Sequence, residues 1–198
     1  LGKLLEYYGD RILKLQNRLL LDKTMLVQAD KLLLPQFRHL QALLALIKPL
    51  LAEGEYDKMR KLLAEPAGTL NVLFRYKRLL QQWQLLQGTA GSSFLQRPQL
   101  AEKLTEEIEN ILVEVDKQLQ QGVYSHCIFK LLAWTEQSLW QNSYYVEVEQ
   151  LAGCRIEDWY NMLKELDIKG DKIDETQAQS ILRICEVIYY ARRSLKID

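Results

Sequence analysis

The chain has 198 residues, of which 48 % are hydrophobic, so it can bury a full core, and global disorder is excluded. Its 26 Lys and Arg residues balance 26 Asp and Glu residues, and this zero net charge gives no general attraction to nucleic acid or to anionic lipid. The longest charge-free stretch, residues 79–96, is rich in Gln and holds a Gly/Ser cluster, which excludes a membrane-spanning helix there.

The three cysteines lie far apart and form no C-x-x-C pair: Cys127, Cys154 and Cys185. We expect them to be small buried residues in a reducing compartment, because a disulfide framework needs regularly spaced, even-numbered cysteines. No signal peptide is recognised at the start of the sequence. These observations together predict a cytoplasmic protein.

Apolar residues recur at alternating three- and four-residue steps through the first half of the chain, which is typical of amphipathic helices. The first stripe consists of Leu5, Tyr8, Ile12, Leu15 and Leu19. We expect a second helix to begin at Pro35 and to be kinked or shortened by Pro49. A short helix over 55–64 should stop at Pro66, and a fourth should run from about 70 to 87.

The second half of the chain has the same helical periodicity after a linker-like Gly/Ser segment at 88–93. Pro98 should open a long helix that Gly122 ends. Further helices are expected at 124–141, 145–152, 156–166 and 175–196. No segment alternates with period two, so the sequence predicts an all-α helical bundle of about eight or nine helices. It should form two subdomains, 1–87 and 98–198.

No constellation of residues predicts catalysis or metal binding. His39 and His126 both lie on apolar helices, away from any Cys or carboxylate at ligand spacing, so we expect them to be structural or surface residues. Phosphate-cradling glycine loops are missing from the sequence. Glu102, Glu106 and Glu109 share one face, but the Glu-x-x-His partners of a two-metal bundle are missing. The sequence therefore predicts a protein that is not an enzyme and needs no cofactor.

A basic stretch offers one candidate binding surface. No acidic residue occurs between Glu65 and Glu102, whereas the segment carries Arg75, Lys77, Arg78 and Arg97. Aromatic residues are interleaved with these cations, a composition that suits single-stranded nucleic acid. The alternative is that the aromatic rings face the core and the cations pair with glutamates elsewhere.

Residues 144–166 read as two helices around a short turn at Ala152-Gly153-Cys154, with Trp159, Leu163 and Leu166 at buried positions of the second helix. This pattern resembles the helix-turn-helix motif, and over 146–196 the layout resembles MerR-type winged-helix domains. The resemblance implies a DNA-reading helix after the turn. That helix is more acidic than basic, which opposes contact with phosphates and favours protein docking.

Aromatic residues are dense in the C-terminal half, and some doublets cannot both face inward. They are Trp134, Trp140, Tyr144, Tyr145, Trp159, Tyr160, Tyr189 and Tyr190. Exposed aromatic rings favour protein interfaces, and burial between subdomains is the alternative. The sequence thus predicts a non-enzymatic interaction module that docks helical faces on a protein partner or its own copy, with nucleic-acid binding as the second hypothesis and no membrane association.

Overall fold

The computed structural model describes residues 2–87, 98–137, 148–166 and 175–196, and these residues form helices joined by short turns, with no strand among them. This confirms the all-α prediction. Within these ranges there are seven α-helices and two 3₁₀ turns rather than eight or nine helices. The helices are α1 (Gly2–Leu21), α2 (Ala29–Ile47), α3 (Glu55–Gln87), α4 (Pro98–Gln120), α5 (Val123–Gln137), α6 (Val148–Glu165) and α7 (Glu175–Leu195), and the 3₁₀ turns are η1 (Lys23–Gln28) and η2 (Lys48–Leu50).

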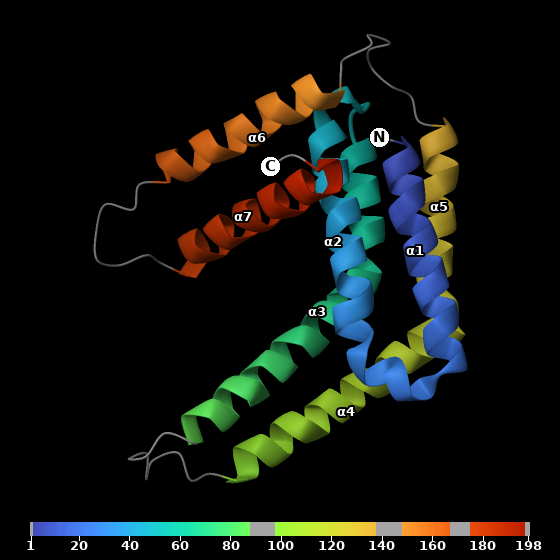
Figure 1. Cartoon of the computed structure of the whole chain (residues 1–198), viewed down its shortest axis with the longest axis vertical. Coiled ribbons are helices and arrows are strands. Elements are labelled where there is room, and N and C mark those ends of the chain that lie inside the picture. The colour runs from blue at the N-terminus through green and yellow to red at the C-terminus, as the bar shows by residue number, and fades with distance from the viewer. Residues whose placement is uncertain (1, 88–97, 138–147, 167–174, 197–198) are drawn as a thin grey trace.

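Helices α1, α2, α5 and the first half of α3 stand side by side as a bundle (Figure 1). The second half of α3 and the first half of α4 extend beyond it as a pair, which we call the α3–α4 arm. Helices α6 and α7 also pack as a pair and project from the other end of the bundle. The distal ends of both pairs lie on the same side of the molecule.

Helix α2 is the centre of the core, because most of its residues are buried on several faces. Its Phe37 ring lies 5.9 Å from the Tyr124 ring of α5, measured between centroids. Buried residues from α1 through α7 form one continuous cluster, so residues before and after 88–97 share a core. Each large apolar side chain buried in this way contributes about 1.5–3 kcal/mol. The division into subdomains 1–87 and 98–198 stays a prediction.

Helix α2 begins at Ala29, so the expected start at Pro35 is wrong. The part of α2 before Pro35 carries Ala29, Leu33 and Leu34, which are all buried. Their burial offsets the loss of the backbone hydrogen bond that a proline inside a helix removes. Before α2, the Asp22 side chain accepts a hydrogen bond from the Thr24 backbone N–H. This contact caps the η1 turn, which follows the end of α1. The effect of Pro49 is confirmed, since α2 ends at Ile47 and continues as a 3₁₀ turn.

Two pairs of predicted helices are single helices. Helix α3 runs through the buried Pro66 and joins the predicted helices 55–64 and 70–87. The helix continues there because its packing against α2, α4 and α5 compensates for the one backbone hydrogen bond that the proline removes. Likewise α6 runs through Gly153, so the turn expected there is not formed. Ala152, Ile156 and Trp159 are buried at helical spacing on the two sides of that glycine, and a helical glycine costs only about 1 kcal/mol. Residues 144–147 lie outside the described ranges.

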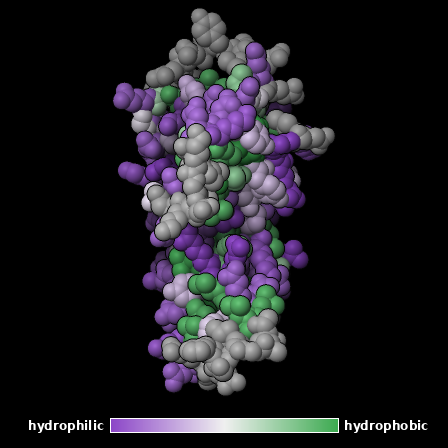
Figure 2. All heavy atoms as spheres, turned by 90° about the vertical axis from the view of Figure 1, so that its left-hand side faces the viewer, coloured by the Kyte–Doolittle hydropathy of each residue, from purple (hydrophilic) through white to green (hydrophobic). Residues whose placement is uncertain are grey.

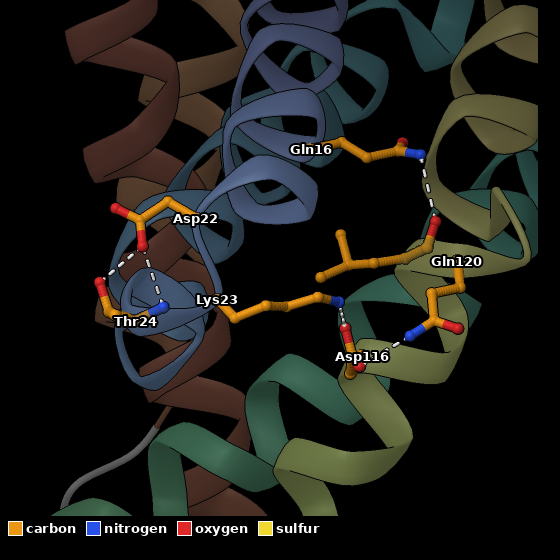
Figure 3. A network of polar contacts seen from close by, with 7 residues as sticks. Gln16, Asp22, Lys23, Thr24, Asp116 and Gln120 are labelled. Carbon is orange, nitrogen blue, oxygen red and sulfur yellow. Dashed lines mark hydrogen bonds and ion pairs between the residues drawn. The ribbon is translucent and has the colours of Figure 1, made fainter.

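Polar contacts hold the corner between α1, η1 and α4 (Figure 3). Lys23 forms an ion pair with Asp116, which also accepts a hydrogen bond from Gln120 Nε2 at 2.8 Å. The buried Gln16 side chain donates to the Leu119 carbonyl at 3.5 Å. The next turn contains Gly122, whose φ of 68° favours glycine and allows the chain to reverse into α5, as expected.

Candidate functional site

Two copies of one short motif meet at a pocket between α1, α2 and α7. The motif is Tyr-Tyr-x-x-Arg, which occurs at residues 7–11 in α1 and at residues 189–193 in α7. In each copy the two tyrosine rings pack edge to face, with centroids 5.1 Å apart in α1 and 5.0 Å apart in α7. The arginine lies one helical turn after the first tyrosine, so its guanidinium reaches the hydroxyl. Arg11 donates to Tyr7 at 3.3 Å, and Arg193 donates to Tyr189 at 2.6 Å.

His39 of α2 lies between the two motifs. Its ring stacks on Tyr8 with a centroid distance of 4.4 Å and meets Tyr190 edge-on at 4.9 Å. Its Nδ1 lies 2.7 Å from Ser194 Oγ, and this hydroxyl donates to the Tyr190 carbonyl at 2.7 Å. Since the hydroxyl has a single proton, we assign the donor of the first contact to His39 Nδ1–H.

Burial keeps the His39 ring neutral. Its pKa is lowered from 6.5 to about 4, mainly by desolvation and also by the positive charges of Arg193 and Arg11, whereas a hydrogen bond to the Tyr190 backbone raises it. A base with so low a pKa removes a proton from a serine hydroxyl poorly at neutral pH. The contact between His39 and Ser194 is therefore suited to positioning the two motifs rather than to activating a nucleophile.

The pocket is cationic and aromatic. It has a volume of about 670 Å³, and its charged lining residues are Arg11, Arg193 and Lys196. None of the described residues that line it is acidic. The side chains of Tyr7 and Tyr189 are exposed at its mouth, each with a guanidinium over its ring. Such a site attracts an anionic group and offers it charge-assisted hydrogen bonds.

Gln36 supplies an acceptor at the same pocket. Its side chain is buried, its Nε2 donates to the Leu32 carbonyl at 3.5 Å, and its Oε1 has no hydrogen-bond partner. A buried acceptor left unpaired costs about 1–3 kcal/mol, so a ligand that brings an N–H or O–H donor would recover this energy. The pocket thus suits a ligand with both negative charge and hydrogen-bond donors.

A second groove of about 680 Å³ lies between α6 and α7 and shares Tyr189, Arg193 and Lys196 with the first pocket. In this groove Arg192 donates to the Tyr160 hydroxyl at 3.2 Å. The described residues that line it include no acid. The positively charged surface therefore extends along the C-terminal part of α7.

The structure separates the aromatic residues that the sequence singled out. Tyr160, Tyr189 and Tyr190 line the two pockets. Trp134 and Trp159 are buried, as the alternative interpretation has it, and Trp134 Nε1 donates to Glu55 at 2.6 Å. The remaining three, Trp140, Tyr144 and Tyr145, lie outside the described ranges.

The basic cluster on α3 is divided. Arg75 and Arg78 are exposed, whereas Lys77 pairs with the buried Asp30 at 2.5 Å and also donates to the Val27 carbonyl. Lys77 is therefore held by the protein itself, and its assignment as a nucleic-acid contact stays a prediction. Arg97 lies outside the described ranges. In the proposed reading helix, Arg155 is occupied by Asp158 at 3.4 Å and by the Trp159 ring.

The remaining polar residues form no further centre in the described ranges. Cys154 and Cys185 are exposed, so the expectation that all three cysteines are buried holds only for Cys127, whose pKa burial raises to about 12. No cluster of three His, Cys, Asp or Glu residues arranged for a metal ion is found there. No described helix combines the length and apolar character that a membrane span requires.

Sequence reasoning missed most of the pocket. It identified Tyr189 and Tyr190 but not Tyr7, Tyr8, Arg11 or Arg193, and it assigned His39 no binding role. A signal was present, because Tyr-Tyr-x-x-Arg occurs twice in one chain.

Comparison of the chain with protein-family models, with curated proteins and with solved structures finds no match.

Proposed function

We propose that the protein is a non-enzymatic interaction module that binds an acidic segment of a protein partner in the pocket between α1, α2 and α7. The observation that carries this proposal is the convergence of two Tyr-Tyr-x-x-Arg motifs on a pocket whose described lining contains three cations and no acid. Carboxylates of the partner would pair with Arg11 and Arg193, and its apolar stems would lie against the tyrosine rings.

A protein segment fits this pocket better than nucleic acid does. A peptide offers a backbone N–H at nearly every residue for Gln36 Oε1, whereas the sugar-phosphate backbone of DNA offers no donor. The inner rings Tyr8 and Tyr190 are packed on His39, and each exposed ring, Tyr7 and Tyr189, already has a guanidinium over it, which leaves less aromatic surface for base stacking. The chain also has no net positive charge, which nucleic-acid binding ordinarily requires.

Fluorescence anisotropy with an array of labelled acidic peptides tests the proposal, with Gln/Asn versions of the same peptides as controls. We expect the acidic peptides alone to bind, with an affinity that falls as salt is added. Replacing both Arg11 and Arg193 by Gln should weaken binding at least about tenfold, since it removes two charge-assisted contacts. The matched control is Arg75→Gln with Arg78→Gln, which removes two exposed cations that do not line the pocket and should leave peptide affinity unchanged.

Two results would contradict the proposal. One is equal affinity for the acidic and the neutral peptides. The other is salt-dependent binding of a single-stranded oligonucleotide that is lost in the Arg75/Arg78 double variant and kept in the Arg11/Arg193 one, which would support the nucleic-acid hypothesis instead.

A further inference from the structure

The α3–α4 arm is a pair of helices that buries little of its own surface. Among the described residues, the last buried residue of α3 is Leu73, and the first buried residue of α4 is Val115. The distal parts of both helices therefore contact each other through partly exposed side chains alone. Figure 2 shows apolar side chains gathered at the end of the molecule where this arm lies. Two helices in such a pair cover only one stripe of each other, so a second apolar stripe needs another partner.

Such a stripe runs along α3. Val72, Tyr76, Leu79, Trp83 and Leu86 follow one another at steps of four, three, four and three residues, which is the spacing of a coiled-coil seam. Val72, Leu79 and Leu86 are 41 %, 51 % and 49 % exposed, and Tyr76 and Trp83 are partly buried. The exposed members of the stripe are symmetric about Leu79, since Val72 and Leu86 each lie seven residues from it.

The neighbouring face of α4 carries charges. Lys77 of α3 and Asp116 of α4 both contact the chain between Lys23 and Asp30, which marks one face of the arm. At about 100° per residue, Leu79 lies about 160° around α3 from Lys77, on the opposite face. By the same count, four exposed residues of α4 lie about 120–180° from Asp116. These are Lys103, Glu107, Asn110 and Glu114.

The register of α3 and α4 shows which residues of the two helices lie at the same level along the arm. Gln118 of α4 donates to Thr69 of α3 at 2.9 Å, which fixes their antiparallel register. Ten residues onward in α3 is Leu79, and ten residues back in α4 is Ile108, so these two lie level. The four polar residues are distributed about this level, with Lys103 and Asn110 alternating with Glu107 and Glu114.

We propose that a second copy of this chain packs on this face, with the two arms antiparallel about a twofold axis at Leu79, forming a four-helix bundle. In that arrangement Leu79 meets its own counterpart and Val72 meets Leu86 of the other copy. On α4, Lys103 meets Glu114 of the other copy, so opposite charges face each other twice. A twofold contact requires this self-complementarity of one surface, and the arm supplies it in both the apolar and the charged positions.

Sedimentation velocity of the full chain tests the arrangement. We expect the unmodified protein to dimerise reversibly and Leu79→Glu, which places two carboxylates at the axis, to raise the dimer dissociation constant at least about 100-fold. The matched control is Leu85→Glu, because Leu85 is exposed on another face of α3 and its replacement should leave the dissociation constant unchanged. Leu79 is half exposed in the single chain, so both variants should keep the helical circular-dichroism spectrum.

A charge exchange identifies the partner as a second copy. Lys103→Glu alone and Glu114→Lys alone each place like charges opposite each other and should each weaken self-association. In an equimolar mixture of the two variants, opposite charges face each other again at both contacts of the mixed dimer, so self-association should be restored. A strictly monomeric unmodified protein would overturn the proposal, as would equal effects of Leu79→Glu and Leu85→Glu or a mixture as weak as its components.

Discussion

Replacing Lys77 by Met tests whether this lysine stabilises the fold. The Asp30 side chain is only 1 % exposed, and its ion-pair partner Lys77 is 20 % exposed. Lys77 also donates to the Val27 carbonyl, so the variant loses two contacts of one ammonium group. Removing one partner of a buried pair leaves an uncompensated charge and costs about 3–5 kcal/mol. That is a large part of the roughly 5–15 kcal/mol by which a domain of ordinary stability stays folded.

Urea unfolding followed by circular dichroism measures this loss. The double variant Asp30→Leu with Lys77→Met removes both charges and should recover most of the lost free energy, because no buried carboxylate remains unpaired. Arg78→Met is the matched control, since Arg78 is exposed on the same helix and should change the free energy of unfolding by less than about 0.5 kcal/mol. A loss below about 1 kcal/mol in Lys77→Met, the value of a surface ion pair, would refute the reasoning.

Two further predictions concern buried rings. His39 has a folded pKa of about 4 against 6.5 when solvated, so the unfolded chain binds the extra proton and stability falls as the pH drops from 6.5 to 4, by at most about 3 kcal/mol. In His39→Phe this part of the pH dependence should vanish in unfolding titrations; an unchanged slope would mean that the ring is protonated in the folded protein. Trp134→Phe removes the hydrogen bond to Glu55 and should lower the free energy of unfolding by about 1.5–3 kcal/mol, whereas Glu55→Gln, which keeps an acceptor, should lose less.

The apolar periodicity of the sequence predicted the helices and their inward faces well. Leu5, Tyr8, Ile12 and Leu19 are all buried, as expected for one stripe, and Leu15, its fifth member, is partly buried. The stops read at Pro49 and Gly122 are correct, whereas those read at Pro66 and Gly153 are wrong, because both residues lie inside continuous helices. The local cost of such a residue is visible in the sequence, but the packing that offsets it comes from other helices and is not.

The pocket could not be assembled from the sequence for a similar reason. Arg11, His39 and Arg193 are distant in the chain and meet only because α2 lies between α1 and α7. Periodicity within one helix says which side chains face inward, but it does not say which helices are neighbours. The repeated Tyr-Tyr-x-x-Arg motif was the one local feature that connected the two ends of the chain.

Gly153→Ala decides between one continuous α6 and the two-helix arrangement that the resemblance implied. In the structure this glycine is helical, and a Cβ at its position would meet nothing within 4 Å. Alanine should therefore raise the free energy of unfolding by about 0.5–1 kcal/mol, because it loses less backbone entropy than glycine on folding into a helix. At a turn that requires a positive φ, the same change would be destabilising, since an L side chain is strained there.

Gly9→Ala provides the contrast within the same protein. Gly9 is also helical, but a Cβ there would lie 3.0 Å from Ile128 Cγ2 of α5, where the two helices approach closely. The propensity gain is then opposed by displacement of a buried side chain, and typical overpacking costs of about 1–3 kcal/mol predict a net loss. Thermal unfolding of both variants should thus give shifts of opposite sign. Destabilisation by Gly153→Ala as well would mean that the chain turns at Gly153, which would support the helix-turn-helix resemblance.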